Sequence, residues 1–212
     1  MPRTSYNGGV DRALNLLLYP SNLASPGRLV KIARSLSPLF SQTRVVGIDQ
    51  GGLPTDEAVA PTVHLTRIRG ASLGAPLGGV RVVCAWGARV YRRFARQRVA
   101  AVSAQNLFLL PLAHALARRT GAVFAYNAHE LETETVGSAG LRQRLQRLIE
   151  RCYIRRADVV SVVNESIAQW YREAYPGVDP VVVTNAPTGA EGVIDLRAQL
   201  GIPKEALLYL HS

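Results

Sequence analysis

A histidine and three glutamates follow a strand-like apolar run in the second half of the chain. The run covers residues 122–126, and His129, Glu130, Glu132 and Glu134 come soon after it. An apolar run of this kind is typical of a buried parallel strand, so we expect His129 in the loop at the carboxyl end of that strand. Ligands of α/β sheets bind at that edge, and an imidazole donates or accepts a hydrogen bond near neutral pH. His129 is therefore the first candidate to meet a substrate.

Two simpler interpretations of this segment stay open. A histidine in a loop can simply make its hydrogen bonds to the backbone, and alternating carboxylates in an exposed loop commonly contact only water. All three glutamates are candidates for binding ligand hydroxyl groups. The segment lacks the second histidine of a zinc-protease helix, so that chemistry is excluded.

The surrounding sequence alternates strand-like runs with segments of helical spacing. The strand-like runs are 13–19, 44–48, 62–66, 99–103, 122–126, 158–163 and 180–184. The helical segments are 26–37, 79–97, 107–119, 138–156 and 164–175. This alternation predicts an α/β fold with a Rossmann-like, doubly wound, mainly parallel sheet. Asn106 and Asn164 are placed to cap the third and fifth helices, and Gly121 to end the third.

Helix 138–156 has the clearest periodicity. An apolar set is expected to pack on the sheet: Leu141, Leu145, Leu148, Ile149 and Cys152. The two cysteines of the chain, Cys84 and Cys152, lie far apart in predicted helices, which indicates small core side chains rather than a disulfide or zinc site.

The composition favours a single large domain with phosphate-bearing partners. The chain has 212 residues, 48% of them hydrophobic, which is enough for a sizeable core. Its formal charge is +10, and all but two of the 25 basic residues are arginine. Anionic lipid, sugar nucleotide and nucleic acid all fit this charge, but the absence of a nucleic-acid-binding motif argues against the last. Without a clear signal peptide or an apolar stretch of about 20 residues, we expect a cytoplasmic protein with at most peripheral membrane contact.

Two basic features have both a functional and a simpler interpretation. Gly27 and Arg28 lie where the first strand leads into the first helix, a position that attracts phosphate, although a loop glycine and a surface arginine are equally expected. Four arginines decorate the amphipathic helix 79–97 and are candidates for membrane contact: Arg89, Arg92, Arg93 and Arg96. We favour the alternative, in which the apolar stripe of this helix faces the core. The fingerprints of dinucleotide- and ATP-binding loops are absent.

From about residue 98 the sequence resembles the N-terminal half of the GT-B glycosyltransferases of family 4. The likeness is carried in order by residues 110–121, 126–130, 149–151 and 156–163, with the first helix at 27–36 and an asparagine turn at 185–187. The chain departs from the family pattern at Asn106, where an acidic residue is expected nearby, and at Asn127, where aspartate is expected. The glycine-rich turn is reduced to Pro26 and Gly27.

The resemblance implies transfer of a sugar from a nucleotide-sugar, with retention of configuration and no bound metal or other cofactor. In such an enzyme His129 orients the transferred sugar, Glu130 supports the loop or a hydroxyl, and Gly27 and Arg28 line the acceptor side. Asn106 and Asn185 are further substrate-binding candidates. The acceptor is expected to be a glycan, a lipid-linked precursor or another intermediate of polysaccharide biosynthesis, at the inner face of the plasma membrane.

The domain division expected from the resemblance is 1–200 for the acceptor-side domain and 201–212 for the start of a second, donor-binding domain. Residues 206–212 have the character of its first strand. The missing C-terminal domain would hold the nucleotide, so this chain alone is expected to be inactive. Two alternatives remain: a non-catalytic α/β module that binds anionic membrane or a partner protein, and an inactive fragment.

Overall fold

The computed structural model describes residues 13–70, 78–133, 140–184, 195–203 and 205–207. Within these residues one eight-stranded sheet has the order β3-β4-β2-β1-β5-β6-β7-β8. The strands are β1 (Leu14–Leu18), β2 (Gln42–Asp49), β3 (Asp56–Ala60), β4 (Val63–Arg69), β5 (Val99–Ala104), β6 (Val123–Ala128), β7 (Val159–Val162) and β8 (Val181–Val182). All neighbours pair in parallel except β3 and β4.

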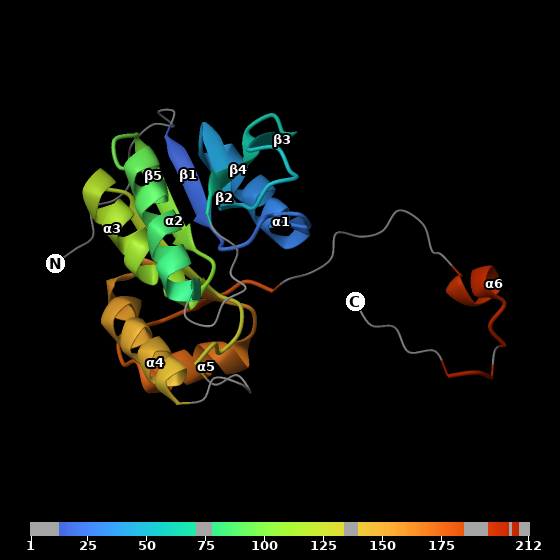
Figure 1. The fold of residues 1–212 in the computed structure, drawn as a ribbon. Coiled ribbons are helices and arrows are strands. Elements are labelled where there is room, and N and C mark those ends of the chain that lie inside the picture. Colours follow the sequence, from blue (N-terminus) through green and yellow to red (C-terminus); the bar gives the residue numbers. More distant parts are fainter. Residues whose placement is uncertain (1–12, 71–77, 134–139, 185–194, 204, 208–212) are drawn as a thin grey trace.

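Helices connect the strands and cover both faces of the sheet (Figure 1). They are α1 (Gly27–Leu36), α2 (Gly78–Phe94), α3 (Leu110–Thr120), α4 (Leu141–Tyr153), α5 (Glu165–Ala174) and α6 (Leu196–Leu200). Three short 3₁₀ turns are η1 (Ser37–Leu39), η2 (Leu107–Leu109) and η3 (Ile154–Arg156). The predicted α/β, Rossmann-like, doubly wound sheet is confirmed.

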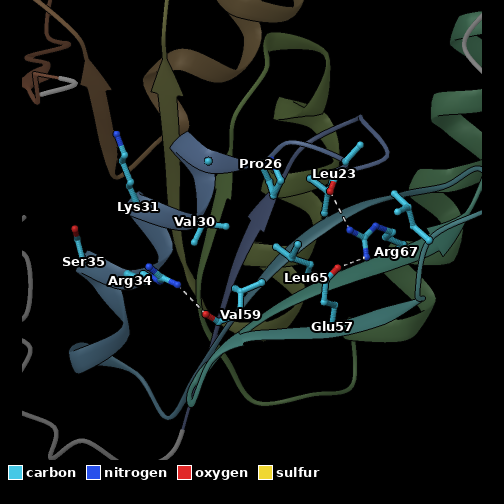
Figure 2. Close-up of a pocket in the computed structure, with 13 residues that line it drawn as sticks. Leu23, Pro26, Val30, Lys31, Arg34, Ser35, Glu57, Val59, Leu65 and Arg67 are labelled. Atoms are coloured by element: carbon cyan, nitrogen blue, oxygen red, sulfur yellow. Dashed lines mark hydrogen bonds and ion pairs between the residues drawn. The ribbon is translucent and has the colours of Figure 1, made fainter. Parts of the chain in front are cut away.

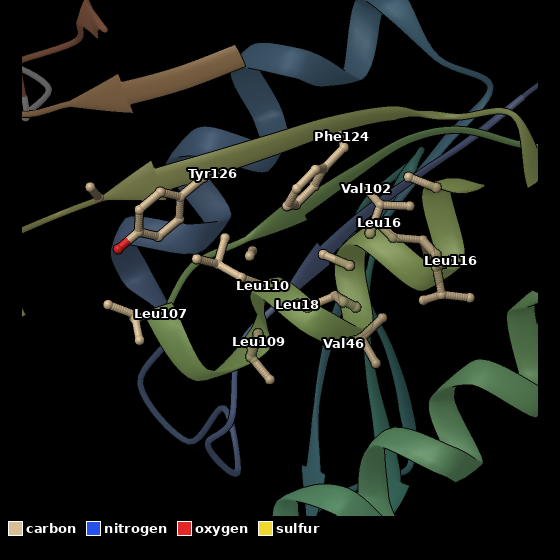
Figure 3. Packing of buried hydrophobic residues seen from close by; sticks show 14 of the residues in the cluster. Leu16, Leu18, Val46, Val102, Leu107, Leu109, Leu110, Leu116, Phe124 and Tyr126 are labelled. Atoms are coloured by element: carbon tan, nitrogen blue, oxygen red, sulfur yellow. The ribbon is translucent and has the colours of Figure 1, made fainter. Parts of the chain in front are cut away.

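Strand β1 shows how the two faces are built. Side chains alternate across a strand. Leu16 and Leu18 join the larger core beneath α2 and α3, whereas Leu17 joins a second core beneath α1. Figure 3 shows Leu16 and Leu18 among leucines from η2 and α3, such as Leu110. All five residues of β1 are buried, as expected for a central strand.

The expected elements are nearly all present, with one strand missed. Asn106 accepts from the Phe108 N–H at 3.0 Å, Asn164 accepts from the Ile167 N–H at 2.9 Å, and Gly121 ends α3 with φ 75°. Strand β3 was not expected, because it begins with Asp56 and Glu57 and its only large apolar residue is Val59. It lies at the edge of the sheet, where charged side chains are tolerated.

The predicted buried face of α4 is wrong for three of its five residues, whereas Ile149 does pack against the core and the side chain of Leu141 lies outside the described residues. Leu145 and Leu148 are 38% and 58% exposed, and Cys152 is exposed too, as is the other cysteine, Cys84. The helix instead buries Glu150, whose carboxylate accepts from two tyrosine hydroxyls of the α5 region, each at 2.8 Å. Satisfying this buried carboxylate sets the rotation of the helix, because a buried charge without partners is costly.

The C-terminal part of the chain is described only in pieces. Helix α6 lies away from the sheet in Figure 1. Most of the expected strand 206–212, and the predicted site residue Asn185, lie outside the described residues. The division at residue 200 therefore stays a prediction. Among the described residues, no helix is long and apolar enough to cross a membrane.

Candidate functional site

Three adjacent strands bring the candidate site together. Strand β1 lies between β2 and β5, so the chain direction across the sheet reverses there, and β6 follows β5. Gln105 directly follows β5, His129 directly follows β6, and Arg28 is the second residue of the helix after β1. Ligands of open α/β sheets bind at this switch point, outside the carboxyl ends of the strands.

These three side chains form one hydrogen-bonded chain. The Arg28 Nη2 lies 2.6 Å from the Nδ1 of His129, and the Nε2 of His129 lies 3.1 Å from the Oε1 of Gln105. A guanidinium only donates, so Nδ1 must accept. The ring proton is therefore on Nε2, which donates to Gln105. The arrangement fixes both the orientation and the tautomer of His129.

His129 is held in its neutral form. Burial lowers the pKa of His129 from 6.5 to about 4, and the neighbouring Arg28 charge acts in the same direction. Burial disfavours the charged imidazolium, and a like charge nearby disfavours it further. At neutral pH the ring is thus a hydrogen-bonding group of fixed polarity rather than a charge or a proton donor.

We predict that His129 titrates in the folded protein with a midpoint near pH 4, and that Arg28→Gln raises this midpoint. The unfolded chain takes up the proton near 6.5 and the folded chain only near 4. The stability that the neutral ring contributes is therefore present above pH 6.5 and falls as the pH drops toward 4. NMR titration of the histidine Cε1 protons, assigned with His129→Asn, measures the midpoint. A midpoint at 6 or above would contradict the buried, arginine-paired geometry.

Gln105 is the site residue that the sequence did not reveal. It is 2% exposed, and its Nε2 has no hydrogen-bond partner among the residues that the structure describes. Buried polar atoms are nearly always paired, so an unpaired N–H beside His129 is a position for an acceptor atom of a ligand. The only sequence signal was its place two residues after the predicted strand 99–103.

The residues that lie next to Gln105 and His129 in the sequence have mainly structural contacts. Asn106 donates from Nδ2 to Glu132 at 2.8 Å and also caps η2, so its polar atoms are engaged within the protein. Glu132 further accepts from the Leu107 N–H at 2.9 Å, which ties the loop after β6 to the start of η2, the turn that follows β5. Glu130 is exposed beside His129. Substrate binding by Asn106 and Glu130 stays a prediction.

Gly27 lies on a different side of α1 from the contact between Arg28 and His129. It borders a groove of about 600 Å³ between α1 and the β3–β4 hairpin. Figure 2 shows Val30 and Leu65 in this groove, with Lys31 and Arg34 along α1. Its volume is within the range of small-molecule sites. The groove therefore has an apolar interior, with the basic groups of Lys31 and Arg34 and the ion pair of Glu57 and Arg67 along its walls.

The apolar stripe of α2 faces the core, as we favoured. Trp86, Val90 and Phe94 are buried, and the Trp86 Nε1 donates to the Gly47 carbonyl at 3.0 Å. These aromatic rings cannot also enter a membrane. The four candidate arginines are exposed, three of them on α2 and the last just after it: Arg89, Arg92, Arg93 and Arg96. Their contact with a membrane stays a prediction.

Metal ligands do not gather in the part of the chain that the structure describes. No group of three or more His, Cys, Asp or Glu side chains is placed there to hold a metal ion. The chemistry available at the strand ends is hydrogen bonding by a neutral imidazole, an amide and a guanidinium.

Comparison with known proteins gives the same fold and places the site within a known domain. The sucrose-phosphate synthase of Thermosynechococcus elongatus superposes with a TM-score of 0.68 at 14% identity, covering 91% of this chain and 53% of that one. HepE of Anabaena, solved with UDP-glucose, superposes with a TM-score of 0.55 at 15% identity, and the match covers 89% of this chain and 50% of HepE. UGT89C1 of Arabidopsis thaliana, solved with quercetin, superposes with a TM-score of 0.59 at 8% identity, and the match covers 90% of this chain and 54% of UGT89C1. The chain spans about half the length of these three structures.

The sequence itself matches a family model. No curated protein sequence matches the chain. The model of the glycosyl transferase 4-like domain matches residues 28–189, which is most of the chain and includes Arg28, Gln105 and His129. These findings confirm the predicted resemblance and the assignment to an N-terminal GT-B domain. The chain belongs to the glycosyl transferase 4-like family.

Proposed function

We propose that this chain is the acceptor-side domain of a glycosyltransferase that moves a sugar from a nucleotide-sugar to a glycan or lipid-linked acceptor. The observation that carries the proposal is the hydrogen-bonded chain of Arg28, His129 and Gln105 at the switch point of the sheet. The family match and the structures solved with UDP-glucose and with quercetin support this class of reaction.

The proposed chemistry uses groups that are already positioned. The unpaired Gln105 N–H would donate to a sugar hydroxyl, and the fixed imidazole of His129 would orient the sugar by holding the Gln105 amide in place. Preorganised hydrogen bonds stabilise a transition state without reorganisation at the moment of reaction. A second domain would bind the nucleotide, and its closure would exclude water around the reacting carbon. We further propose that the transfer proceeds with retention and without a metal.

The acceptor side is proposed to be the groove along α1. Its apolar interior and the neighbouring Lys31 and Arg34 suit an acceptor that carries both apolar and anionic parts. A lipid-linked precursor of a surface polysaccharide has this chemistry, and transfer to it would place the protein at the inner face of the plasma membrane. The formal charge of +10 supports such a location.

We expect Arg28→Ala to lower kcat/KM for sugar transfer by about 10-fold, since the His129 ring loses the donor that fixes its tautomer. The assay follows transfer from a panel of labelled nucleotide-sugars to extracted lipid-linked acceptors, with the protein as its source cells make it. Arg119→Ala, an exposed substitution at the end of α3, is the matched control and should stay within twofold. Equal rates for Arg28→Ala and the parent would contradict the proposed site.

The second candidate function is a non-catalytic module that binds anionic membrane or a partner protein. The exposed arginines of α2 favour it. The intact mass of the protein from its source cells separates the two. A product of 23.0 kDa without transfer activity supports the module, whereas a product larger by about 200 residues supports the enzyme.

A further inference from the structure

Helix α4 presents an exposed apolar row that the fold does not use. Leu145, Leu148 and Cys152 are spaced three and four residues apart, so they line one side of the helix. All three are exposed, Leu148 by more than half. A single exposed leucine needs no explanation, but an aligned row of them on one helix is a candidate contact surface.

A basic row runs beside the apolar one. Arg144, Arg147 and Arg151 share the neighbouring side of α4, and all three are exposed. The only acidic residue of this helix, Glu150, is 1% exposed on the opposite side, where it accepts from two tyrosine hydroxyls. No carboxylate of α4 therefore interrupts the exposed combination of leucine and arginine.

We infer that α4 docks on the surface of an anionic lipid bilayer. Its leucines would enter the boundary between headgroups and acyl chains, and its arginines would contact the lipid phosphates. A helix with apolar side chains next to arginines binds such a surface through both buried area and charge. The inference adds a specific docking surface to the membrane location proposed above, and it depends only on this surface and not on the site at His129.

Helix α2 is less suited to the same role. It also carries exposed arginines, but its large apolar side chains, Trp86 and Phe94, are buried in the core. Over residues 84–94, where the structure describes its side chains, it offers charge without an exposed row of large apolar residues, so the attraction of this part to a membrane would be electrostatic. The structure thus assigns the docking face to α4, where both contributions coincide.

Charge argues against a second copy of the chain on this face. A symmetric contact along the leucine row would bring the arginine rows of both copies together, and like charges in an interface are unfavourable. A bilayer with anionic headgroups complements the same row. Contact with a second copy is nonetheless an outcome that the experiment distinguishes.

The test is co-sedimentation of the 212-residue chain with vesicles of phosphatidylcholine alone or with 30% phosphatidylglycerol. We expect binding only to the anionic vesicles. Leu145→Gln with Leu148→Gln should weaken it at least 10-fold, and Arg144→Gln with Arg151→Gln about 30-fold. The matched control, Arg89→Gln with Arg92→Gln on α2, should weaken it less than 3-fold. Because every substituted side chain is exposed, circular dichroism and the thermal midpoint should stay unchanged.

Several results would overturn the inference. One is the absence of binding to the anionic vesicles. Another is a loss of vesicle binding in the α2 control that equals or exceeds the loss of vesicle binding in the α4 variants. If the leucine variants instead change the mass in analytical ultracentrifugation and leave vesicle binding intact, the row contacts a second copy. His129→Ala should bind vesicles like the parent, so failure of the docking face and failure of the transfer site are distinguishable.

Discussion

The variant His129→Ala is expected to lower kcat/KM for sugar transfer by about 100-fold. Alanine removes the neutral ring that holds the Gln105 amide in one orientation, and the Gln105 N–H is then no longer preorganised to donate to the transferred sugar. Loss of one preorganised hydrogen-bonding group in an active site typically costs about 10²–10³ in rate. Steady-state kinetics on the protein as its source cells make it, with the preferred nucleotide-sugar, measure the effect.

The control for this variant is His64→Ala. His64 lies on β4 and contacts Asp56 at the far edge of the sheet, so transfer should stay within twofold of the parent. Because the pKa of His129 is lowered to about 4, its ionisation should produce no inflection of kcat between pH 5 and 8. Turnover of His129→Ala within a factor of two of the parent would remove the basis for the proposed site.

The position of His129 could be predicted because local signals determine it. A glycine that ends α3 and an apolar run that forms β6 place the residue at a strand end, and strand ends gather at one edge of a parallel sheet. The caps at Asn106 and Asn164 are similarly local, since each side chain binds a backbone N–H two or three residues away. Such features need no knowledge of the tertiary packing.

Gln105 could not be found in the same way. Its contact with His129 joins residues 24 positions apart on neighbouring strands, and the pairing of β5 with β6 had to be known first. The contact of Arg28 with His129 spans 101 positions. The sequence thus predicted Arg28 and His129 separately, and only the sheet order brings them together with Gln105.

The prediction of which side of α4 faces the core was wrong for a related reason. Periodicity correctly predicts a helix, but Leu145 and Leu148 were assigned to the core by their hydrophobicity alone. The buried side is decided by Glu150, whose partners Tyr171 and Tyr175 come from α5 and the residue that follows it. A buried carboxylate is stable only with such donors, and their position follows from the tertiary fold.

The largest expected effect on stability comes from Arg67 on β4. Its guanidinium is buried, with the residue 3% exposed, and it donates to the carbonyls of Asn22, Leu23 and Pro54 and to the Glu57 carboxylate. We expect Arg67→Met to lower the free energy of unfolding by about 3–5 kcal/mol, because the variant leaves buried acceptors without donors. Urea unfolding followed by tryptophan fluorescence should show a lower midpoint with an unchanged slope.

Two further variants separate the carbonyl contacts of Arg67 from its ion pair. Glu57 is 42% exposed at its side chain and lies 3.0 Å from the guanidinium, so Glu57→Gln should cost no more than about 1 kcal/mol. Arg69→Ala, exposed two residues further along the same strand, should change stability by less than about 0.5 kcal/mol. If Glu57→Gln lowered the free energy of unfolding as much as Arg67→Met, the ion pair would be the stabilising contact. The expected order instead assigns the effect to the carbonyls, through which one arginine joins β4 to the loop that leads into α1 and the candidate site.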